Sequence, residues 1–380
     1  MPVGGCSRTA ARQPQLVVPI ETGSLTELLG KYIGKRYHPA LVQNDSAGRG
    51  KTIMKQIVLV EPGVWGERDA PPPSAASGEA LVRVHRIGVC GSDLNAFKGE
   101  HPAYSFPRVI GHELGVEVVD AGQNNSGIQA GDRCAVESFY SCGRCRACRS
   151  GRTNCCEQLK YLGIHIDGGM QPLLNVPANK LFKSERLSFD QLALVEPLAV
   201  GAQAINRSGL QKGEDVLVIG SGVIGLAVVA FAKARSARVH VAELLLWRRE
   251  FAKSLGVEVM ETAAGNQYSV VVDATGNTAS MEASFQNVAP GGRLVFVGLV
   301  SGSLAFPDWL FHRREITVLA SRGSLNLFPQ VIKVLEKGEI DISSWVTHRL
   351  DWRDVPRQFA DLRSQADLVK AMIHINEAVV

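Results

Sequence analysis

Residues 216–225 read Val-Leu-Val-Ile-Gly-Ser-Gly-Val-Ile-Gly. The stretch opens with four apolar residues without polar alternation, which is typical of a buried parallel strand. Glycines at the spacing GxGxxG follow, and a helical pattern covers 222–234. In this context Gly220 allows the turn, Gly222 lets a pyrophosphate approach, and Gly225 lets the helix pack on the strand. The helix N-terminus adds amide donors for phosphate. The stretch therefore predicts a dinucleotide-binding unit.

The residues after this unit repeat its pattern. Further apolar runs occupy Val239–Ala242, Val270–Asp273 and Leu294–Val297, and helical segments such as Trp247–Leu255 lie between them. Alternation of strands and helices indicates a doubly wound α/β domain. We place this domain at residues 207–342.

One link of this domain is too short for the usual crossover helix. Only nine residues separate Val257–Met260, the expected third strand, from Val270. In the strand order 3-2-1-4 the link spans about 20 Å. Nine extended residues reach about 30 Å, so an extended link suffices. We predict that the helix is missing between Glu261 and Ser269.

The chain before the α/β domain has a different pattern. Short strand-like runs, such as Ile57–Val60, Ala80–Val84 and Gly115–Val119, are separated by glycine-rich turns. They predict a β-rich domain over residues 54–206, which we expect residues 343–380 to complete. Residues 1–53 lack a clear period, and we expect a disordered extension there, with a transit peptide as the alternative.

Composition excludes several classes of protein. Hydrophobic residues make up 45% and charged residues 21%, as in ordinary globular proteins. No apolar run approaches the roughly 20 residues of a membrane helix. The net charge of +4 arises in residues 1–53, so the remaining chain lacks the clustered charge of a nucleic-acid surface. We expect a cytoplasmic protein that binds neither membrane nor nucleic acid.

The cysteines have the spacing of metal ligands. The chain has 8 cysteines, and five of them lie between positions 142 and 156. Four thiolates at this spacing let one loop wrap a tetrahedral zinc ion, and a site with four cysteines is structural because it keeps no open position. The expected ligands are Cys142, Cys145, Cys148 and Cys156. Cys155 competes with Cys156 for the fourth position.

The strand after the glycine motif ends in an acid. Glu243 is placed to accept hydrogen bonds from the adenosine ribose and to repel a 2′-phosphate, which favours NAD over NADP. A solvated strand-end acid is the alternative, and Arg248 and Arg249 could tolerate a phosphate. We expect these residues to contact the cofactor: Gly220, Gly222, Val223, Ile224, Gly225, Glu243, Arg248, Thr275, Gly276, Gly298 and Arg322.

Two dispersed pairs complete the pattern: Cys90 in the motif CGSD, and His112 with Glu113 in the motif GHE. Together with the zinc loop and the glycine motif, they resemble the medium-chain zinc alcohol and polyol dehydrogenase family. The resemblance runs from Met54 to the C-terminus. It includes the segments GVCGSD (88–93), GHE (111–113), AGDR (130–133), CRSGRTNCCE (148–157), EPLAVGA (196–202), VVDATGN (271–277) and GGRLVFVGL (291–299).

The resemblance implies a GroES-like β-rich catalytic domain joined to a Rossmann domain. It also implies a second, catalytic zinc ion on Cys90 and His112, with Glu113 and Glu196 sharing the remaining contacts. Zinc would stabilise the alkoxide of an alcohol while NAD accepts the hydride. Ser92 would pass the proton towards solvent. Asp93 would accept the second imidazole N–H of His112.

The position two residues after Asp93 is often histidine in such relatives, and here it is Asn95, which cannot titrate. A relay through water or the NAD ribose would replace it, with His101 as the alternative. The segments YLGIHIDGG (161–169) and VTHRL (346–350) resemble the sugar-acid and polyol branch, including L-galactonate 5-dehydrogenase. L-threonine and sorbitol dehydrogenases are less similar.

The resemblance suggests a substrate and an assembly. Arg322 could pair with a sugar-acid carboxylate, or it could be a solvated loop residue. We expect NAD-linked oxidation of a secondary hydroxyl by a homodimer or homotetramer, in which the strand near Leu294–Leu299 could pair between subunits. An L-threonine dehydrogenase, a non-catalytic NAD(H)-binding relative and a zinc-free quinone reductase are the alternatives.

Overall fold

The structure is a computed structural model that describes residues 43–44, 50–51, 53–263 and 265–375. Most of the extension expected at residues 1–53 lies outside these ranges. Two short strands, β1 (Gln43–Asn44) and β2 (Gly50–Lys51), form an antiparallel ladder. The described residues form one compact unit.

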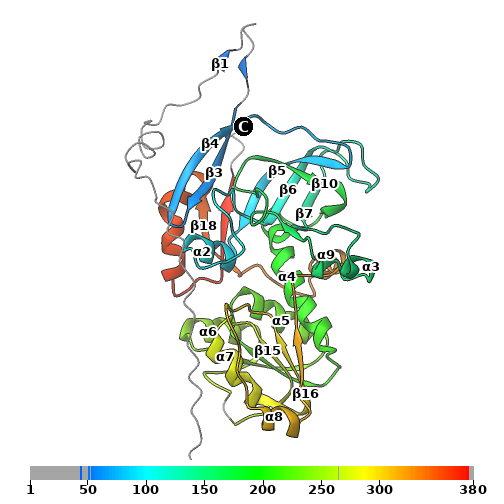
Figure 1. Ribbon diagram of the computed structural model, residues 1–380, viewed down its shortest axis with the longest axis vertical. Coiled ribbons are helices and arrows are strands. Elements are labelled where there is room, and N and C mark those ends of the chain that lie inside the picture. Colours follow the sequence, from blue (N-terminus) through cyan, green and yellow to red (C-terminus); the bar gives the residue numbers. More distant parts are fainter. Residues whose placement is uncertain (1–42, 45–49, 52, 264, 376–380) are drawn as a thin grey trace, which may run out of the picture. The chain divides into compact units, whose positions relative to one another are not determined.

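The first half of the described chain builds a β-rich sheet (Figure 1). Two strands from the C-terminal end join it: β19 pairs with β5, and β18 runs parallel to β19. Among the described residues the order is β11-β7-β6-β5-β19-β18, and β10 also pairs with β5. The strands are β5 (Glu79–Gly88), β6 (Glu113–Asp120), β7 (Arg133–Val136), β10 (Leu173–Pro177), β11 (Leu181–Lys183), β18 (Val346–Asp351) and β19 (Lys370–His374).

Smaller elements surround this sheet. Two antiparallel pairs are β3 with β4 and β8 with β9. Their bounds are β3 (Met54–Glu61), β4 (Val64–Ala70), β8 (Phe139–Tyr140) and β9 (Lys160–Tyr161). The helices of this part are α2 (Gly91–Phe97), α3 (Arg146–Arg149), α10 (Val355–Gln358), and the 3-10 turns η1 (Thr153–Cys155), η2 (Ala178–Lys180), η4 (Trp352–Asp354) and η5 (Phe359–Ser364).

The second sheet is parallel throughout, and its order in the described chain is β14-β13-β12-β15-β16-β17. This is the doubly wound arrangement that the apolar runs predict. Its strands are β12 (Asp215–Ile219), β13 (Arg238–Ala242), β14 (Glu258–Met260), β15 (Tyr268–Asp273), β16 (Val288–Phe296) and β17 (Thr317–Ala320). Its helices are α5 (Val223–Ala234), α6 (Leu246–Ser254), α7 (Thr278–Ala283), η3 (Ser284–Asn287), α8 (Asp308–Arg313) and α9 (Phe328–Glu336).

Two expectations about this sheet meet different outcomes. The described residues between β14 and β15, 261–263 and 265–267, form no helix, which confirms the missing crossover helix. The proposed pairing of Leu294–Leu299 between subunits is wrong for β16. This strand already has β15 on one side and β17 on the other, so its backbone groups are used within the sheet.

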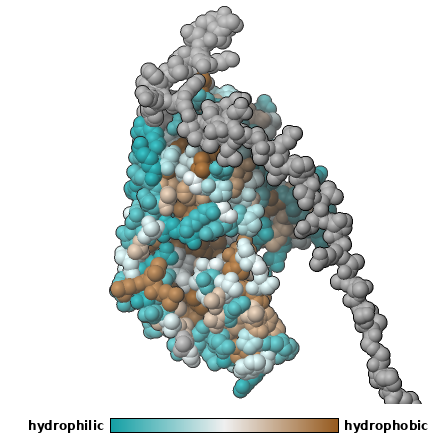
Figure 2. Space-filling view, turned by 60° about the vertical axis from the view of Figure 1, so that its left-hand side comes forward, coloured by the Kyte–Doolittle hydropathy of each residue, from teal (hydrophilic) through white to brown (hydrophobic). Residues whose placement is uncertain are grey.

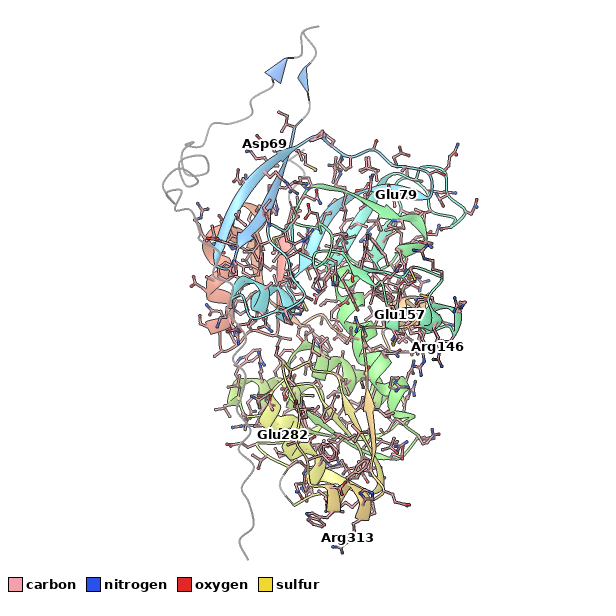
Figure 3. The ribbon with its side chains drawn as sticks, viewed as in Figure 1. Asp69, Glu79, Arg146, Glu157, Glu282 and Arg313 are labelled. Atoms are coloured by element: carbon pink, nitrogen blue, oxygen red, sulfur yellow. The ribbon has the colours of Figure 1, made fainter. Side chains whose placement is uncertain are left out.

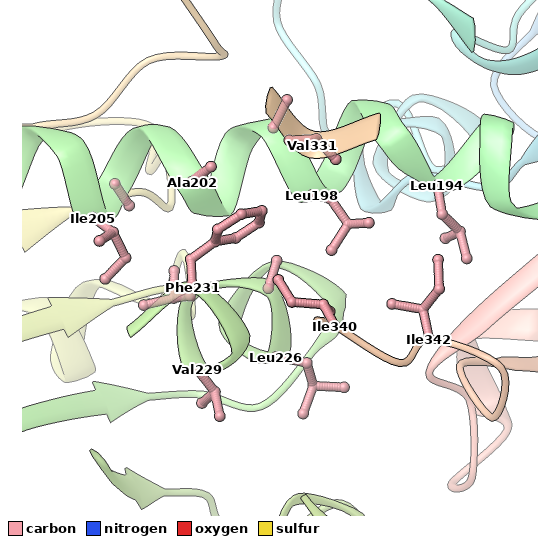
Figure 4. Close-up of a cluster of buried hydrophobic side chains, with 14 of the residues drawn as sticks. Leu194, Leu198, Ala202, Ile205, Leu226, Val229, Phe231, Val331, Ile340 and Ile342 are labelled. Carbon is pink, nitrogen blue, oxygen red and sulfur yellow. The ribbon is translucent and has the colours of Figure 1, made fainter. Parts of the chain in front are cut away.

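The long helix α4 (Phe189–Ser208) packs against both sheets. Ser188 caps its first turn by accepting from the Gln191 amide, and Gly209 ends it with a φ of +63°. Its apolar side chains meet those of α5 and α9 in one buried cluster (Figure 4). The helix passes the domain boundary placed at 206, and that boundary stays a prediction.

The surface mixes polar and apolar areas, and the face in Figure 2 shows brown patches among teal. The most exposed large apolar side chains include Leu299, Leu244, Leu246 and Trp309. Within the described residues, no helix is both long enough and apolar enough to cross a membrane.

Candidate functional site

The loop that follows β8 gathers four thiols. Ligand atoms of Cys142, Cys145, Cys148 and Cys156 all lie within 4.8 Å of one another. Arg146 and Glu157, labelled in Figure 3, mark this loop. Cys155 is exposed and lies outside the group, whereas Cys156 is buried. The geometry therefore selects Cys156 from the two candidates.

Backbone amides point at these sulfur atoms. The Cys142 amide donates to Cys156 Sγ at 3.3 Å, and the Cys145 amide donates to Cys142 Sγ at 3.4 Å. Amides from Cys148 and Glu157 lower the pKa of Cys145 to about 6. Hydrogen bonds to the charged form favour the thiolate, which is the form that binds metal. The four-cysteine loop therefore fits a zinc ion.

A second group forms where β5, β6 and β19 meet. Ligand atoms of Cys90, His112 and Glu113 lie within 4.8 Å of one another. Register pairs Gly88 with Glu113 across β5 and β6. A Cβ on Gly88 would lie 2.1 Å from Glu113 Oε2, so only glycine leaves room for this carboxylate.

Lys370 holds the Glu113 carboxylate. Its Nζ lies 2.8 Å and 2.7 Å from the two carboxylate oxygens and donates to the Val89 carbonyl at 3.0 Å. Both side chains are 1% exposed. Burial alone would lower the pKa of Lys370, but the charges of Glu113, Cys90 and Glu196 and the hydrogen bond to Glu113 together raise it. Glu113 is thus a paired carboxylate.

Cys90 and His112 are held on either side of Asp93. Cys90 precedes α2, and its amide donates to Asp93 Oδ2 at 3.0 Å. Tyr104 donates to Asp93 Oδ1 at 3.0 Å, and the same oxygen lies 3.7 Å from His112 Nδ1. The expected hydrogen bond from His112 to Asp93 is therefore too long in this structure, because amide and phenol donors already fix the carboxylate.

Glu196 approaches the group from α4. Burial and the negative charges of Glu113 and Asp93 together raise its pKa to about 7, and the positive charges of His112 and Lys370 oppose them. It lies outside the group of three but shares its electrostatic field. Ser92 is also near, since Tyr104 Oη lies 3.5 Å from its Oγ. Asn95 accepts from Arg363 at 3.2 Å.

The glycine motif adopts the expected strand–turn–helix. Gly220 has a φ of +87°, and Gly222 precedes α5, whose first residues are Val223 and Ile224. A Cβ on Gly225 would lie 1.9 Å from the Gly220 carbonyl oxygen. The glycines thus serve the turn and the close packing for which the motif selects them.

The acid after β13 faces this turn. Glu243 Oε2 accepts from the Ser221 amide at 2.8 Å, and Oε1 accepts from the Leu245 amide at 2.9 Å. Arg249 donates to the carbonyls of Glu243 and Leu244. Arg248 donates to the Leu368 carbonyl at 3.3 Å. These contacts fix the carboxylate and occupy both arginines.

The other expected cofactor residues lie on the loops after β15, β16 and β17. A Cβ on Gly298 would lie 2.3 Å from the Gly276 amide nitrogen, and one on Gly220 would lie 2.9 Å from Thr275 Cγ2. These loops therefore meet the glycine motif. Arg322 is exposed after β17, and its carbonyl accepts from Asn154 at 2.9 Å, beside the cysteine loop.

The chain matches two protein-family models and several known dehydrogenases. Residues 76–186 match the model "Alcohol dehydrogenase GroES-like domain", and residues 223–337 match "Zinc-binding dehydrogenase". The chain is 36% identical over 325 residues to L-galactonate-5-dehydrogenase of Escherichia coli K12, covering 82% of this chain and 95% of that protein. It is 30% identical over 319 residues to L-threonine 3-dehydrogenase of Pyrococcus horikoshii, covering 78% of this chain and 91% of that protein.

The same fold is found in a solved structure. A short chain alcohol dehydrogenase (rspB) from Escherichia coli CFT073 complexed with NADH superposes with a TM-score of 0.80 at 28% identity, covering 85% of this chain and 99% of that one. The chain therefore belongs to the zinc-type medium-chain alcohol dehydrogenase family, and it is an oxidoreductase. The predicted GroES-like and Rossmann architecture is confirmed.

Sequence reasoning missed two members of the site. Lys370 opens the apolar strand Lys370–His374, and a lone lysine there could have indicated a buried charge partner. Tyr104 is the second missed residue. Its hydroxyl is a buried donor to Asp93, and a phenol in a loop carries no signal of that role.

Proposed function

We propose that this enzyme oxidises a secondary hydroxyl of a polyol or sugar acid, with NAD as the hydride acceptor. The observation that carries the proposal is the group of Cys90, His112 and Glu113, whose ligand atoms lie within 4.8 Å of one another. A thiol, an imidazole and carboxylates are the donors of catalytic zinc sites. His112 Nδ1 faces Asp93 Oδ1 at 3.7 Å, which leaves Nε2 of the same ring for a metal ion.

In this proposal Cys90 and His112 bind the catalytic zinc, and Cys142, Cys145, Cys148 and Cys156 bind the structural one. The ion pair with Lys370 ties Glu113 away from direct ligation and leaves Glu196 as the freer carboxylate. A catalytic zinc ion supplies Lewis acidity that lowers the pKa of a bound hydroxyl. Ser92 would accept the released proton while donating its own to water, which would carry it onward because Asn95 cannot titrate.

NAD is the proposed cofactor because Glu243 presents a fixed carboxylate at the end of β13. An acid there would repel a 2′-phosphate. Arg249 is held by two carbonyls and lies 3.5 Å from Glu261, so it is not free to bind that phosphate. A related structure from Sinorhizobium meliloti 1021 is bound to NADP, at 27% identity and a TM-score of 0.80, so both cofactors belong in the assay.

A sugar acid is the proposed substrate class. L-galactonate-5-dehydrogenase is a relative over nearly its whole length. Within the described residues, no acidic side chain pairs with the exposed Arg322, which leaves its guanidinium available for a carboxylate. L-threonine oxidation is the second candidate, supported by the L-threonine 3-dehydrogenase relative.

The test is NADH formation by zinc-loaded protein with a panel of polyols, aldonates and L-threonine, each with NAD and NADP. We expect an aldonate or polyol to give the highest kcat/KM, with NAD preferred. Metal content separates the alternatives: two zinc ions per chain support the dehydrogenase, one supports a non-catalytic relative, and none supports a quinone reductase. Zinc-loaded protein that is inactive on the whole panel contradicts the proposal.

We also propose a homodimer or homotetramer in a reducing cytoplasm. The edge strand β17 has a neighbour on one side among the described strands, and Val318 on it is exposed. Such an edge can pair with another chain. The free thiols of the described chain suit a reducing compartment. Sedimentation of wild type and of a Val318→Lys variant tests the assembly, which the lysine should weaken.

A further inference from the structure

The loop of residues 161–169 is hydrogen-bonded to the segment that leads to His112. The Gly168 amide donates to the Val109 carbonyl at 2.6 Å, and the Gly169 amide donates to the Gly111 carbonyl at 2.9 Å. A Cβ on Gly168 would lie 2.3 Å from the same Gly111 oxygen. Because Gly111 directly precedes His112, these contacts fix the loop relative to the catalytic group.

His165 is the exposed residue at the tip of this loop. Its Nδ1 accepts a hydrogen bond from the Tyr161 amide at 3.0 Å. A neutral imidazole that accepts at Nδ1 carries its proton at Nε2. Burial lowers the pKa of His165, and the charges of Arg108 and Arg322 lower it further, which keeps the ring neutral. The loop therefore presents one N–H donor of fixed identity.

Tyr161 connects His165 with the Arg322 segment, since the Tyr161 and His165 ring centroids lie 6.3 Å apart. Burial lowers the pKa of His101, the Asp93 charge opposes this, and the charges of His112 and His165 lower the pKa further. Burial likewise raises the pKa of Tyr161, Glu196 raises it further, and Arg322 opposes them. A Cβ on Gly323 would lie 2.7 Å from Tyr161 Oη, which places this phenol against the Arg322 segment.

We propose that His165 Nε2–H and the Arg322 guanidinium together bind the carboxylate of an aldonate substrate. The inference rests on the proposed function and adds a specificity-determining residue to it. Arg322 supplies the positive charge, and His165 supplies a neutral donor from the 161–169 loop. Two such donors suit the two oxygens of a carboxylate. A neutral alditol offers only hydroxyl groups to this subsite, so it gains less from both residues.

The test compares His165→Phe, which removes the donor, with His165→Gln, which keeps an N–H donor. His312→Phe is the matched control, because His312 is exposed on α8, which belongs to the domain of the parallel sheet. Steady-state kinetics of the zinc-loaded enzyme use L-galactonate and the corresponding alditol with saturating NAD. We expect His165→Phe to raise the KM for the aldonate on the order of 10- to 100-fold, as for a hydrogen bond to a charged group.

The same variant should leave the KM for the alditol, the zinc content and the affinity for NADH nearly unchanged. His165→Gln should recover much of the aldonate affinity. An unchanged KM for the aldonate in an active His165→Phe enzyme overturns the role of His165 while the proposed function stands. Equal increases for both substrates, or a loss of zinc, show a structural role and also overturn it. A wild-type enzyme inactive on every aldonate and polyol contradicts the proposed function, and the subsite with it.

Discussion

Replacing Lys370 by methionine removes one half of a buried ion pair and leaves the other half in place. The Glu113 carboxylate would lose its two contacts with Lys370 Nζ, at 2.8 Å and 2.7 Å, and the Val89 carbonyl would lose its hydrogen bond of 3.0 Å from the same nitrogen. Glu113 is 1% exposed, so water cannot replace these bonds without rearrangement. Breaking a buried pair by removing one partner costs about 3–5 kcal/mol. We expect Lys370→Met to lower the free energy of unfolding of metal-free protein by about this amount.

The assay is denaturant unfolding of metal-free and zinc-loaded protein, followed by fluorescence. A zinc ion near the freed Glu113 carboxylate replaces the lost cation, so the loss should be smaller in zinc-loaded protein. The double variant Lys370→Met/Glu113→Gln should recover stability relative to Lys370→Met, because no unpaired charge remains. Lys337→Met is the control. Lys337 forms an exposed ion pair with Glu339, and its removal should cost at most about 1 kcal/mol. A Lys370→Met loss no larger than that of Lys337→Met would refute the reasoning.

Three further predictions test other parts of the molecule. Cys156→Ser should lose one zinc ion per chain and lower the melting temperature, whereas Cys155→Ser should keep both ions. Metal analysis of the two variants measures this difference, and equal zinc losses would contradict the choice of Cys156 as the ligand. Gly225→Ala places a Cβ 1.9 Å from the Gly220 carbonyl and should cost about 1–3 kcal/mol of stability. In Gly222→Ala the added Cβ meets only the end of Arg248 at 3.8 Å, so the unfolding midpoint should not change. Because Gly222 lets the pyrophosphate approach, the same variant should weaken NADH binding in a fluorescence titration. Burial lowers the pKa of His85 from 6.5, although Glu117 lies 3.0 Å away. The neutral His85 side chain therefore contributes stability above pH 6.5, and this stability is lost as the pH falls towards the pKa of the folded protein. His85→Gln should flatten this loss in unfolding measured across pH, and His312→Gln should not.

The parallel sheet followed from local patterns. Each of its central strands is a short apolar run, and burial on both faces makes such runs legible in sequence. Boundaries were less accurate: β16 begins at Val288, six positions before the expected Leu294, because Pro290 and two glycines interrupt its apolar pattern. The edge position of β17 was not predicted, since strand order depends on packing between distant segments.

The two metal sites differ in how far sequence could determine them. Cys142, Cys145, Cys148 and Cys156 lie within one loop, so their spacing alone indicates a common ligand. The choice between Cys155 and Cys156 needed the backbone, which turns one sulfur inward and leaves the other exposed. Cys90 and the pair His112 and Glu113 come from two separate segments, which were grouped by family resemblance alone.

By itself, the sequence determined the strand–turn–helix of the glycine motif, the four-cysteine loop and the family, because each depends on residues close together in the chain or on recognisable motifs. The tertiary structure decided which charges meet. Lys370 reaches Glu113 across 257 residues because β19 pairs with β5 and β5 with β6. The 161–169 loop meets the Arg322 segment, because a Cβ on Gly323 would lie 2.7 Å from Tyr161 Oη. No local pattern specifies such meetings, because they depend on the order in which strands from both ends of the chain assemble.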